Sequence, residues 1–305
     1  MRGITIRLRH LWIASILIAL SAAQFASAEM IEKRPYPAVV YQQIDQADPP
    51  RKIFVANIDL KNPDVQIRVS RGGDDPDGAG EWETILQPPS KIANREKFDI
   101  VINGDFFSAE KTKDAEGKAS GFVEGKRAKV VGPAVTDGEL WGPAEKARPA
   151  LIVRRGNEVS IEGALKDPPK DAMQVVAGSD VILRDGANVA KTKGEFFETR
   201  HPRTAVGIAD GGKRLVMVVV DGRRKDRVGM QLTELADLMK SLGCKDAMNL
   251  DGGGSSELAM RNPETGQLEV KNSPSDYRER SVGNVLGVTI NGAKRVNSPV
   301  TAPKK

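Results

Sequence analysis

The stretch Asn249-Leu250-Asp251-Gly252-Gly253-Gly254-Ser255-Ser256 decides how the middle of this chain is interpreted. The apolar residues 247–250 predict a short buried strand, which ends abruptly in an acid, three glycines and two serines. Three successive glycines are costly to order, so this run is expected where the backbone approaches another group closely. Its amide groups can form a concavity that binds an anion, and Asp251 adds a carboxylate beside it. The alternative is an ordinary tight turn that Asp251 caps with its own side chain.

The segments before this stretch predict a sheet with a helix packed on it. Residues 231–242 are the clearest helix, because apolar side chains recur at helical spacing and Gly243 follows them. The apolar face consists of Leu232, Leu235, Leu238, Met239 and Leu242. Further upstream, residues 204–208 and 214–220 predict a hairpin through Asp210-Gly211-Gly212.

The rest of the chain is dominated by short strand patterns. A short helix is expected at 90–96, and strands at 53–60, 65–70, 98–102, 150–153, 159–161, 174–177, 181–184 and 283–290. Because strands outnumber helices, the expected fold class is mixed α+β, with mostly antiparallel sheets and a few packed helices. The charged, Gly-rich residues 109–129 are expected to form a mobile loop.

The first 28 residues are expected to be a cleavable signal peptide. Arg2, Arg7 and Arg9 precede an apolar segment, and Ala26-Ser27-Ala28 is a small-residue cleavage pattern. The apolar segment is shorter than the roughly 20 residues of a spanning helix, so an uncleaved anchor is the less favoured alternative. The expected location is therefore periplasmic or secreted, with no stable membrane insertion after cleavage. Residues 29–49 are expected to be a Pro-rich lead-in with one short strand, 50–292 the main domain, and 293–305 a disordered tail.

Charge and composition exclude several classes of protein. Removal of the signal lowers the formal net charge from +5 to +2, and no basic run interleaved with aromatic residues is present, so nucleic-acid binding is not expected. Cys244 is the only cysteine, so no intramolecular disulfide can form. His201 is the only histidine after cleavage, which excludes zinc sites built on several histidines. It leaves one Ser-His-Asp arrangement, which is disfavoured because no G-x-S-x-G motif is present.

Several polar clusters lie where the predicted strands begin or end, which is where sites are commonly built on a rigid scaffold. These clusters are Asn103-Gly104-Asp105, His201-Pro202-Arg203-Thr204, Asp221-Gly222-Arg223, residues 251–256, and Glu279-Arg280. Each cluster alone is weak, since Asp-Gly is a common turn signal. Their order along the chain is more specific than any one of them.

The motifs in that order resemble one family. NGDFF at 103–107, PRTAVGI at 202–208, VVVDGR at 218–223, NLDGGGSS at 249–256 and ERSVGN at 279–284 look like the phosphodiester glycosidase domain, the family of N-acetylglucosamine-1-phosphodiester α-N-acetylglucosaminidase. The resemblance covers roughly residues 50–292. It implies an enzyme that releases a sugar from a sugar-1-phosphodiester in envelope glycans or glycoconjugates, with α-linked N-acetylglucosamine as one candidate sugar. One departure is Asp105, where the family commonly has glycine, and it suggests a different substrate or an extra carboxylate.

The chemistry implied by the resemblance assigns roles to these clusters. The leaving group is a phosphate ester, so stabilising the departing charge matters more than protonating it. Arg203 could hold phosphate oxygens in a bidentate fork, and the amides of residues 252–254 could bind the same charge. The other residues expected to contact substrate are Asn103, Asp105, Thr204, Arg223, Ser255, Ser256 and Arg280. For Asn103 the alternative is an Asx-turn that holds the strand end.

Three acids remain for the role of nucleophile or base. Asp251 is the first choice, because it adjoins the expected anion site, and Glu279 or Asp221 could supply a second carboxylate. Asp221 could instead be a turn former, and His201 could be a general acid or only a partner of phosphate or backbone. No cofactor is required by this chemistry. The acidic clusters could accommodate calcium, but nothing in the sequence calls for a metal, and the oligomeric state is not defined. A different class of function, a non-catalytic module that binds envelope polysaccharide or takes part in exopolysaccharide processing, remains the alternative.

Overall fold

The structure, a computed structural model, describes residues 28–113 and 121–295. These residues form twenty-one β-strands and three α-helices, and the paired strands are all antiparallel. The expected antiparallel sheets are therefore confirmed, but the mixed α+β class is corrected to a mostly-β fold. The reason lies in residues 127–188, which lack helical periodicity and form eight short strands.

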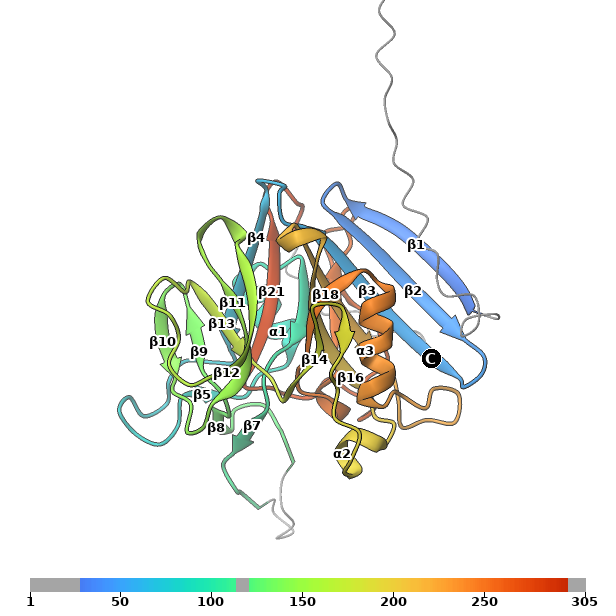
Figure 1. Ribbon diagram of the computed structural model, residues 1–305. Coiled ribbons are helices and arrows are strands. Elements are labelled where there is room, and N and C mark those ends of the chain that lie inside the picture. Colours follow the sequence, from blue (N-terminus) through green and yellow to red (C-terminus); the bar gives the residue numbers. More distant parts are fainter. Residues whose placement is uncertain (1–27, 114–120, 296–305) are drawn as a thin grey trace, which may run out of the picture.

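The largest sheet has eight strands in the order β1-β2-β3-β17-β16-β18-β14-β15 (Figure 1). The predicted hairpin forms its centre, with β16 and β17 in register from Arg203↔Val220 to Ala209↔Arg214. The strand bounds are β1 Ala28–Tyr36, β2 Val39–Gln46, β3 Arg51–Asp59, β14 Asp180–Arg184, β15 Ala187–Asn188, β16 Arg203–Ala209, β17 Arg214–Val220 and β18 Cys244–Asn249.

Three smaller sheets complete the molecule. One has the order β20-β19-β6-β21-β4, with β4 Val65–Arg71, β6 Ile100–Asn103, β19 Leu258–Arg261, β20 Leu268–Val270 and β21 Asn284–Ile290. Another has the order β10-β9-β13-β11-β12, with β9 Ala134–Thr136, β10 Glu139–Gly142, β11 Arg148–Val153, β12 Val159–Leu165 and β13 Gln174–Ala177. The third joins β5 Thr84–Ile85, β8 Arg127–Val130 and β7 Phe107–Ala109.

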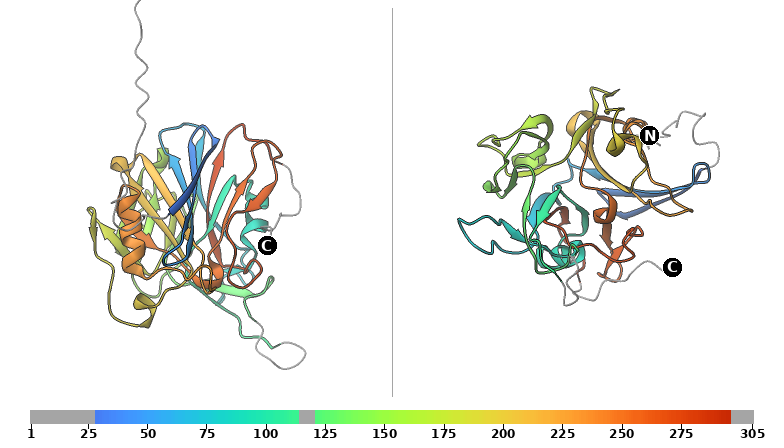
Figure 2. Two further views of the ribbon diagram at one scale, coloured as in Figure 1. Left: turned by 90° about the vertical axis from the view of Figure 1, so that its right-hand side faces the viewer. Right: turned by 90° about the horizontal axis from the view of Figure 1, so that it is seen from below.

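Two large sheets are packed face to face, with a helix on each outer side (Figures 1 and 2). Alternate residues of β17 belong to two different cores, as the two-residue period of a strand requires. Leu215, Met217 and Val219 pack toward the sheet that contains β6 and β21. Residues 216, 218 and 220 pack under α3 Leu232–Ser241, which confirms the predicted helix. The short predicted helix is α1 Pro89–Glu96, which covers the far side of the β6–β21 sheet. The third helix, α2 Glu195–Glu198, precedes β16.

The N-terminal lead-in expected at 29–49 is instead part of the largest sheet. Residues 28–36 and 39–46 form β1 and β2, and β2 pairs with β3 over its whole length. Prolines at 35 and 37 obscured these strands in the sequence, although strand edges and turns tolerate proline. The expected signal peptide lies outside the described residues except for Ala28, and so do residues 114–120 of the expected mobile loop and all of the expected tail beyond Arg295.

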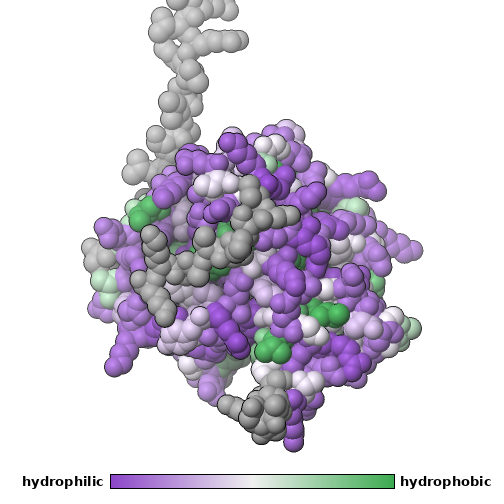
Figure 3. Space-filling model, turned by 180° about the vertical axis from the view of Figure 1, so that it is seen from behind, coloured by the Kyte–Doolittle hydropathy of each residue, from purple (hydrophilic) through white to green (hydrophobic). Residues whose placement is uncertain are grey.

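The surface is largely hydrophilic on the face opposite that of Figure 1, with only small, scattered apolar spots (Figure 3). Within residues 28–113 and 121–295, none of the helices has the length and apolar character needed to cross a bilayer.

Candidate active site

The candidate site lies at one end of the two packed sheets, near α2 and β7 at the bottom of Figure 1. Asn103 ends β6, Asp221 follows β17 and Asp251 follows β18, whereas Arg203 begins β16. Because the strands are antiparallel, the end of one strand lies beside the beginning of its neighbour. The Asp251 amide donates to the Gly104 carbonyl at 3.0 Å, which joins the two sheets at this point. The structure therefore brings the clusters predicted from the sequence together.

Asp251 is the half-buried carboxylate at the centre of this end. Its Oδ1 accepts a hydrogen bond from the Gly252 amide at 2.8 Å. Burial raises the pKa of Asp251 to about 6, although the Ser255 hydroxyl, the Gly252 amide and the guanidinium groups of Arg280 and Arg223 all lower it. Asp251 is therefore ionised at neutral pH and more basic than an ordinary aspartate, which suits a nucleophile or a base.

Two guanidinium groups lie directly over the glycine turn. Gly253 has a φ of 63°, and a Cβ at this position would press on the guanidinium of Arg223. A Cβ on Gly254 would collide with the guanidinium of Arg280. This close approach is the physical reason for glycine at these positions. Both arginines also act electrostatically on Asp251, so the turn, the carboxylate and two positive charges form one site.

The two arginines differ in how they are held. Arg280 is fixed, because its Nε and Nη2 contact Asp276 Oδ2 at 2.9 and 2.7 Å and its guanidinium stacks on Phe122 at 5.0 Å from the ring centroid. Arg223 is exposed and makes no hydrogen bond or ion pair within the described residues. Its φ of 60° is a left-handed conformation that is uncommon for a residue other than glycine. Such backbone strain is often found at functional sites, and here it accompanies an unpaired charge above the turn.

The backbone amides are less available than the sequence suggested. The Gly252 amide donates to Asp251, and the Gly253 amide donates to the Pro202 carbonyl at 2.9 Å. Because these two groups already have partners, the predicted nest of three amides is not open to an anion. The positive charge at the turn comes from side chains instead.

Arg203 has a different role from the phosphate fork predicted for it. The residue is 1% exposed, and its Nε donates to the Met230 carbonyl at 3.0 Å. Its Nη2 donates to the carbonyls of Phe196 and Thr199 at 2.7 and 3.1 Å. Burial and the nearby Arg223 lower the pKa of Arg203 to about 10. The guanidinium thus connects α2 and the segment before α3 to the start of β16. Its hydrogen-bond acceptors are backbone carbonyls.

Asn103 and Thr204 form a buried latch between the two sheets. Neither residue is exposed. Asn103 Nδ2 donates to the Asp251 carbonyl at 2.7 Å, and Asn103 Oδ1 accepts from the Thr204 hydroxyl at 2.7 Å. The latch fixes the backbone that carries Asp251, so both residues position the site and do not face it. The structure thus supports a structural role for Asn103 at the strand end, through this latch.

Asp221 is saturated by protein partners. Its carboxylate accepts hydrogen bonds from Asn272 Nδ2, from the Ser273 amide and from Arg227 Nη1, the last at 3.0 Å. It is 1% exposed, and burial raises its pKa. Because its oxygens are occupied, Asp221 anchors the 272–273 segment and has little capacity left for a reaction.

Asp105, the departure from the family pattern, is a buried carboxyl beside the site. Its Oδ1 and Oδ2 accept from the amides of Phe106 and Gly132, both at 2.7 Å. Burial raises the pKa of Asp105 to about 7, and the negative charge of Asp251 adds to that rise. The extra carboxylate inferred from the sequence is thus present and electrostatically coupled to Asp251.

His201 is half-buried near two of the arginines. Burial lowers its pKa, and the positive charges of Arg203 and Arg223 lower it further. The imidazole is therefore neutral at pH 7 and can accept or donate a hydrogen bond at the edge of the site. Because a neutral imidazole has no imidazolium proton to donate, this state argues against His201 as the general acid.

One residue of this region was missed by sequence reasoning, namely Glu257. Its carboxyl lies against that of Glu279, and it is 1% exposed. On the segments that follow the glycine turn and precede Arg280, the buried oxygens with no hydrogen-bond partner include Ser256 Oγ, Glu257 Oε1, Ser275 Oγ and Glu279 Oε1. The signal available in the sequence was an acid placed directly after residues 252–256, where the alternation of side chains along the following strand predicts a buried position. Buried polar atoms without partners usually indicate a strained or functional location.

No cluster of three or more histidine, cysteine, aspartate or glutamate side chains in the described part of the chain is arranged to hold a metal ion. The structure therefore adds no support for the calcium site that the acidic clusters could accommodate.

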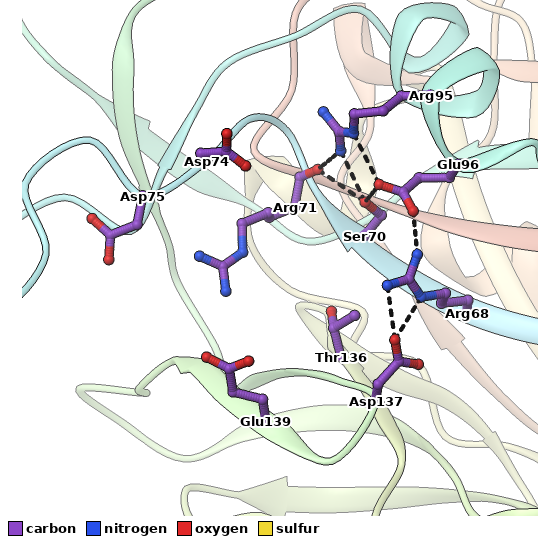
Figure 4. Close-up of a pocket in the computed structure, with 10 residues that line it drawn as sticks. All are labelled: Arg68, Ser70, Arg71, Asp74, Asp75, Arg95, Glu96, Thr136, Asp137 and Glu139. Carbon is purple, nitrogen blue, oxygen red and sulfur yellow. Dashed lines mark hydrogen bonds and ion pairs between the residues drawn. The ribbon is translucent and has the colours of Figure 1, made fainter.

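A separate cavity of about 550 Å³ opens between β4, α1 and the β9–β10 hairpin (Figure 4). Arg68 bridges Glu96 and Asp137, and Arg95 contacts Glu96, so half of the charged side chains that line the cavity are paired with one another. Arg71 extends into the space and its guanidinium lies over the ring of Trp141 at 5.1 Å. None of the residues predicted from the sequence lines this cavity, and it forms no part of the site around Asp251.

The fold and the site together define a class of protein: a mostly-β scaffold that carries a basic carboxylate and two arginines at a glycine turn. The family model described as phosphodiester glycosidase matches residues 96–289. This chain therefore belongs to the phosphodiester glycosidase family, as its motifs predicted.

Relatives of known sequence agree with this assignment. The chain is 25% identical over 159 residues to N-acetylglucosamine-1-phosphodiester alpha-N-acetylglucosaminidase of Mus musculus, and 37% identical over 93 residues to the SPbeta prophage-derived uncharacterized protein YomE of Bacillus subtilis. These matches cover 46% and 30% of this chain. The chain spans only 30% and 13% of the length of those two relatives.

Solved structures show the same fold. The catalytic domain of zebrafish N-acetylglucosamine-1-phosphodiester alpha-N-acetylglucosaminidase, auto-inhibited by its pro-peptide, matches with a TM-score of 0.60 and 20% identity over 86% of this chain and 88% of that chain. A hypothetical protein from Synechocystis matches with a TM-score of 0.61 and 13% identity over 86% of this chain and 64% of that chain. A putative exported protein from Burkholderia pseudomallei matches with a TM-score of 0.53 and 17% identity over 79% of this chain and 74% of that chain.

Proposed function

We propose that this protein is an exported phosphodiester glycosidase that hydrolyses a sugar-1-phosphodiester in envelope glycans or glycoconjugates. The observation that carries the proposal is the Asp251 carboxylate beside Arg223 and Arg280, both of which lie over the glycine turn. The name of the Mus musculus relative states a substrate, N-acetylglucosamine-1-phosphodiester, so α-linked N-acetylglucosamine is the first sugar to test.

The two arginines are assigned to the phosphate. The bond that breaks lies between the anomeric carbon of the sugar and a phosphate oxygen, and the electron pair leaves with that oxygen. A guanidinium pair stabilises the resulting phosphate charge by charge-assisted hydrogen bonds. Arg223 has no partner within the described residues, so its donors are free to bind phosphate, while Arg280 is held over Gly254 by Asp276.

Asp251 is assigned to the sugar. At neutral pH it is a carboxylate with a pKa of about 6, and it either attacks the anomeric carbon or removes a proton from the attacking water. In both routes one water is consumed, a free sugar forms, and a phosphomonoester is released. A strong general acid is not needed because the phosphate leaves as a stable anion. His201, neutral beside Arg203 and Arg223, is assigned as a hydrogen-bond partner of the phosphate.

Export rests on the N-terminal sequence. The positive residues, apolar segment and Ala26-Ser27-Ala28 pattern are typical of a signal peptide. The single cysteine is buried and unpaired, so the fold needs no disulfide in whichever compartment it occupies. Fractionation of cells that express the full chain, with a mass measurement of the mature protein, tests both the location and the cleavage site.

A substrate panel tests the activity. Protein lacking residues 1–28 is incubated with sugar-1-phosphodiesters of several sugars and with aryl glycosides of the same sugars. The proposal predicts turnover of at least one phosphodiester and much slower turnover of the matching aryl glycoside, because only the former offers a phosphate to the arginines. Saturable binding of envelope polysaccharide with no turnover of any phosphodiester would instead support the non-catalytic binding module.

A further inference from the structure

Two glutamates behind the site, the buried Glu257 and the half-buried Glu279, offer a function that the proposed chemistry does not use. Glu257 follows the glycine turn and Glu279 immediately precedes Arg280. The two side chains are in hydrogen-bond contact, and Glu257 is 1% exposed. One oxygen of each, Oε1, is buried without a partner. Ser90 donates to the pair, and its Oγ lies 2.5 Å from Glu279 Oε2.

Two carboxylates in contact away from water cannot both carry a charge without a large cost. The usual solution is one proton held between them. A bound cation is the other solution, but the described residues include no third acid, histidine or cysteine that would complete a ligand set. A neutral hydroxyl donor from Ser90 also fits one carboxylate and one carboxylic acid. Proton sharing is therefore the better account of this pair.

The charged groups around the pair do not replace that proton. On α1, Lys91 is ion-paired with Glu124, and after β20, Lys271 is ion-paired with Glu269. Arg280 is ion-paired with Asp276. None of these cations contributes to the pKa of Glu257, which is raised well above its ordinary value by burial first and then by Glu279.

The position of the pair connects it to both halves of the site. The Glu257 amide donates to Asn103 Oδ1 at 3.2 Å, and Asn103 Nδ2 holds the Asp251 carbonyl at 2.7 Å. On the other side, Glu279 is bonded through the backbone to Arg280, the arginine over Gly254. Any movement that separates the two carboxyls therefore changes how Arg280 sits relative to Asp251.

We propose that Glu257 and Glu279 share one proton and act as a clasp that positions Arg280 relative to Asp251, and that loss of this proton opens the clasp. The sharing of one proton does not depend on the proposed function, whereas the consequence for turnover rests on it. Glu257 and Glu279 are assigned as positioning residues, since they are proposed to act through Arg280.

The first test needs no substrate. Melting temperatures are measured between about pH 5 and pH 9 for the wild type, for Glu257→Gln and Glu279→Gln, and for the control Glu264→Gln, whose side chain is exposed on the β19–β20 turn. A buried carboxyl with a raised pKa stabilises the fold below the unfolded pKa of about 4.3, and that contribution is lost as the pH rises through the folded pKa. A glutamine at either position donates permanently to the remaining carboxylate. We therefore expect a smaller alkaline fall in melting temperature for the two clasp variants than for the wild type and the control.

Infrared spectroscopy gives a second readout that does not depend on stability. At about pH 9, well above the pKa of about 7 of Asp105, the wild type and Glu264→Gln should retain the carbonyl stretch of one protonated carboxyl. Both clasp variants should lack it. Retention of that band, together with an unchanged melting profile, in Glu257→Gln and Glu279→Gln would overturn the proposal. A wild-type melting temperature that falls on addition of a chelator, with no fall in the variants, would also overturn it, in favour of a bound cation.

The third experiment tests whether the clasp positions Arg280 in the active site. If the clasp positions Arg280, the wild type should show a rise in KM for a phosphodiester above about pH 9, where the shared proton is lost, and both variants should lose that rise while the control keeps it. An alkaline rise that persists unchanged in both variants would refute the positioning role. Absence of turnover in every protein would count against the proposed function, while the melting and infrared results would still decide whether the clasp exists.

Discussion

Arg203 and Arg223 allow a sharp test, because the sequence suggested that both contact the substrate, whereas in the structure Arg203 contacts backbone carbonyls and only Arg223 lies over the glycine turn. Each is replaced by lysine, which keeps the charge but removes the planar fork. Arg203 is 1% exposed and its Nε and Nη2 donate to three backbone carbonyls. Arg223 is exposed, lies against Gly253, and has no partner within the described residues. The first change should affect stability and the second should affect turnover.

The magnitudes follow from the bonds that are lost. A hydrogen bond from a charged group contributes roughly 1.5–3 kcal/mol, and one lysine amine cannot reach three carbonyls at the geometry of a guanidinium. Loss of two of the bonds of Arg203 should lower the free energy of unfolding by about 3–6 kcal/mol, which lowers the melting temperature by on the order of 10 °C for a chain of this size. Arg223→Lys should change stability by no more than about 0.5 kcal/mol. If Arg223 binds the departing phosphate, its loss of bidentate contact should slow turnover of a phosphodiester by about ten- to a hundredfold.

The assay is a denaturant titration and a turnover measurement on the same preparations. Arg278→Lys is the matched control, because Arg278 is exposed and close in sequence to the site. An Arg203→Lys protein as stable as this control would refute the structural role of Arg203. Full turnover of a phosphodiester by Arg223→Lys would refute the assignment of Arg223 to the phosphate, and would return that role to Arg203 if Arg203→Lys were folded but inactive.

Three further predictions concern the same end of the sheets. The kcat/KM for a phosphodiester should rise with pH through about 6 as Asp251 ionises, and a kcat/KM that is flat between about pH 5 and pH 7 would show that this carboxylate is not required in its charged form. Gly254→Ala should lower the affinity for a phosphodiester, measured as KM, because the new methyl group displaces Arg280; an unchanged KM would mean that Arg280 does not contact the substrate. Asp105 has a folded pKa of about 7, so its contribution to stability is present below its unfolded pKa of about 3.9 and is lost as the pH rises through about 7. Asp105→Asn should therefore reduce the loss of unfolding free energy between about pH 4 and pH 8, by up to about 4 kcal/mol, and an unchanged pH profile in urea titrations would contradict the raised pKa.

Much of the fold was readable from local patterns. The hairpin of β16 and β17 followed from two apolar runs joined by Asp210-Gly211-Gly212, and α3 followed from its leucine spacing. Residues 29–49 were misread because prolines and polar residues interrupt β1 and β2, whose strand structure depends on pairing with β3. Pairing between strands distant in sequence leaves no local signal, so the sheet order could not be predicted.

The location of the site was also readable, but the roles of its residues were not. Clusters at strand ends predicted that Asp251, the turn of residues 252–254 and Arg203 would lie together, and the Gly253 amide does donate to the carbonyl of Pro202, the residue before Arg203. Which arginine faces the turn depends on the directions of side chains, and the sequence could not show that Arg203 is occupied by carbonyls. Glu257 was missed because its meaning depends on Glu279, a residue 22 positions away that only the folded chain brings into contact.

The proposed mechanism depends most directly on the charge of Asp251. In Asp251→Asn, the amide oxygen can still accept the hydrogen bond that Oδ1 receives from the Gly252 amide at 2.8 Å, so the turn should survive. Turnover of a sugar-1-phosphodiester and the melting temperature are measured on one preparation of this variant and compared with the wild type. We predict a melting temperature within a few degrees of the wild type and a fall in kcat of several orders of magnitude, with little change in KM. A folded Asp251→Asn protein that retains wild-type turnover would contradict the mechanism, because the carboxylate would then serve only to cap its own glycine turn.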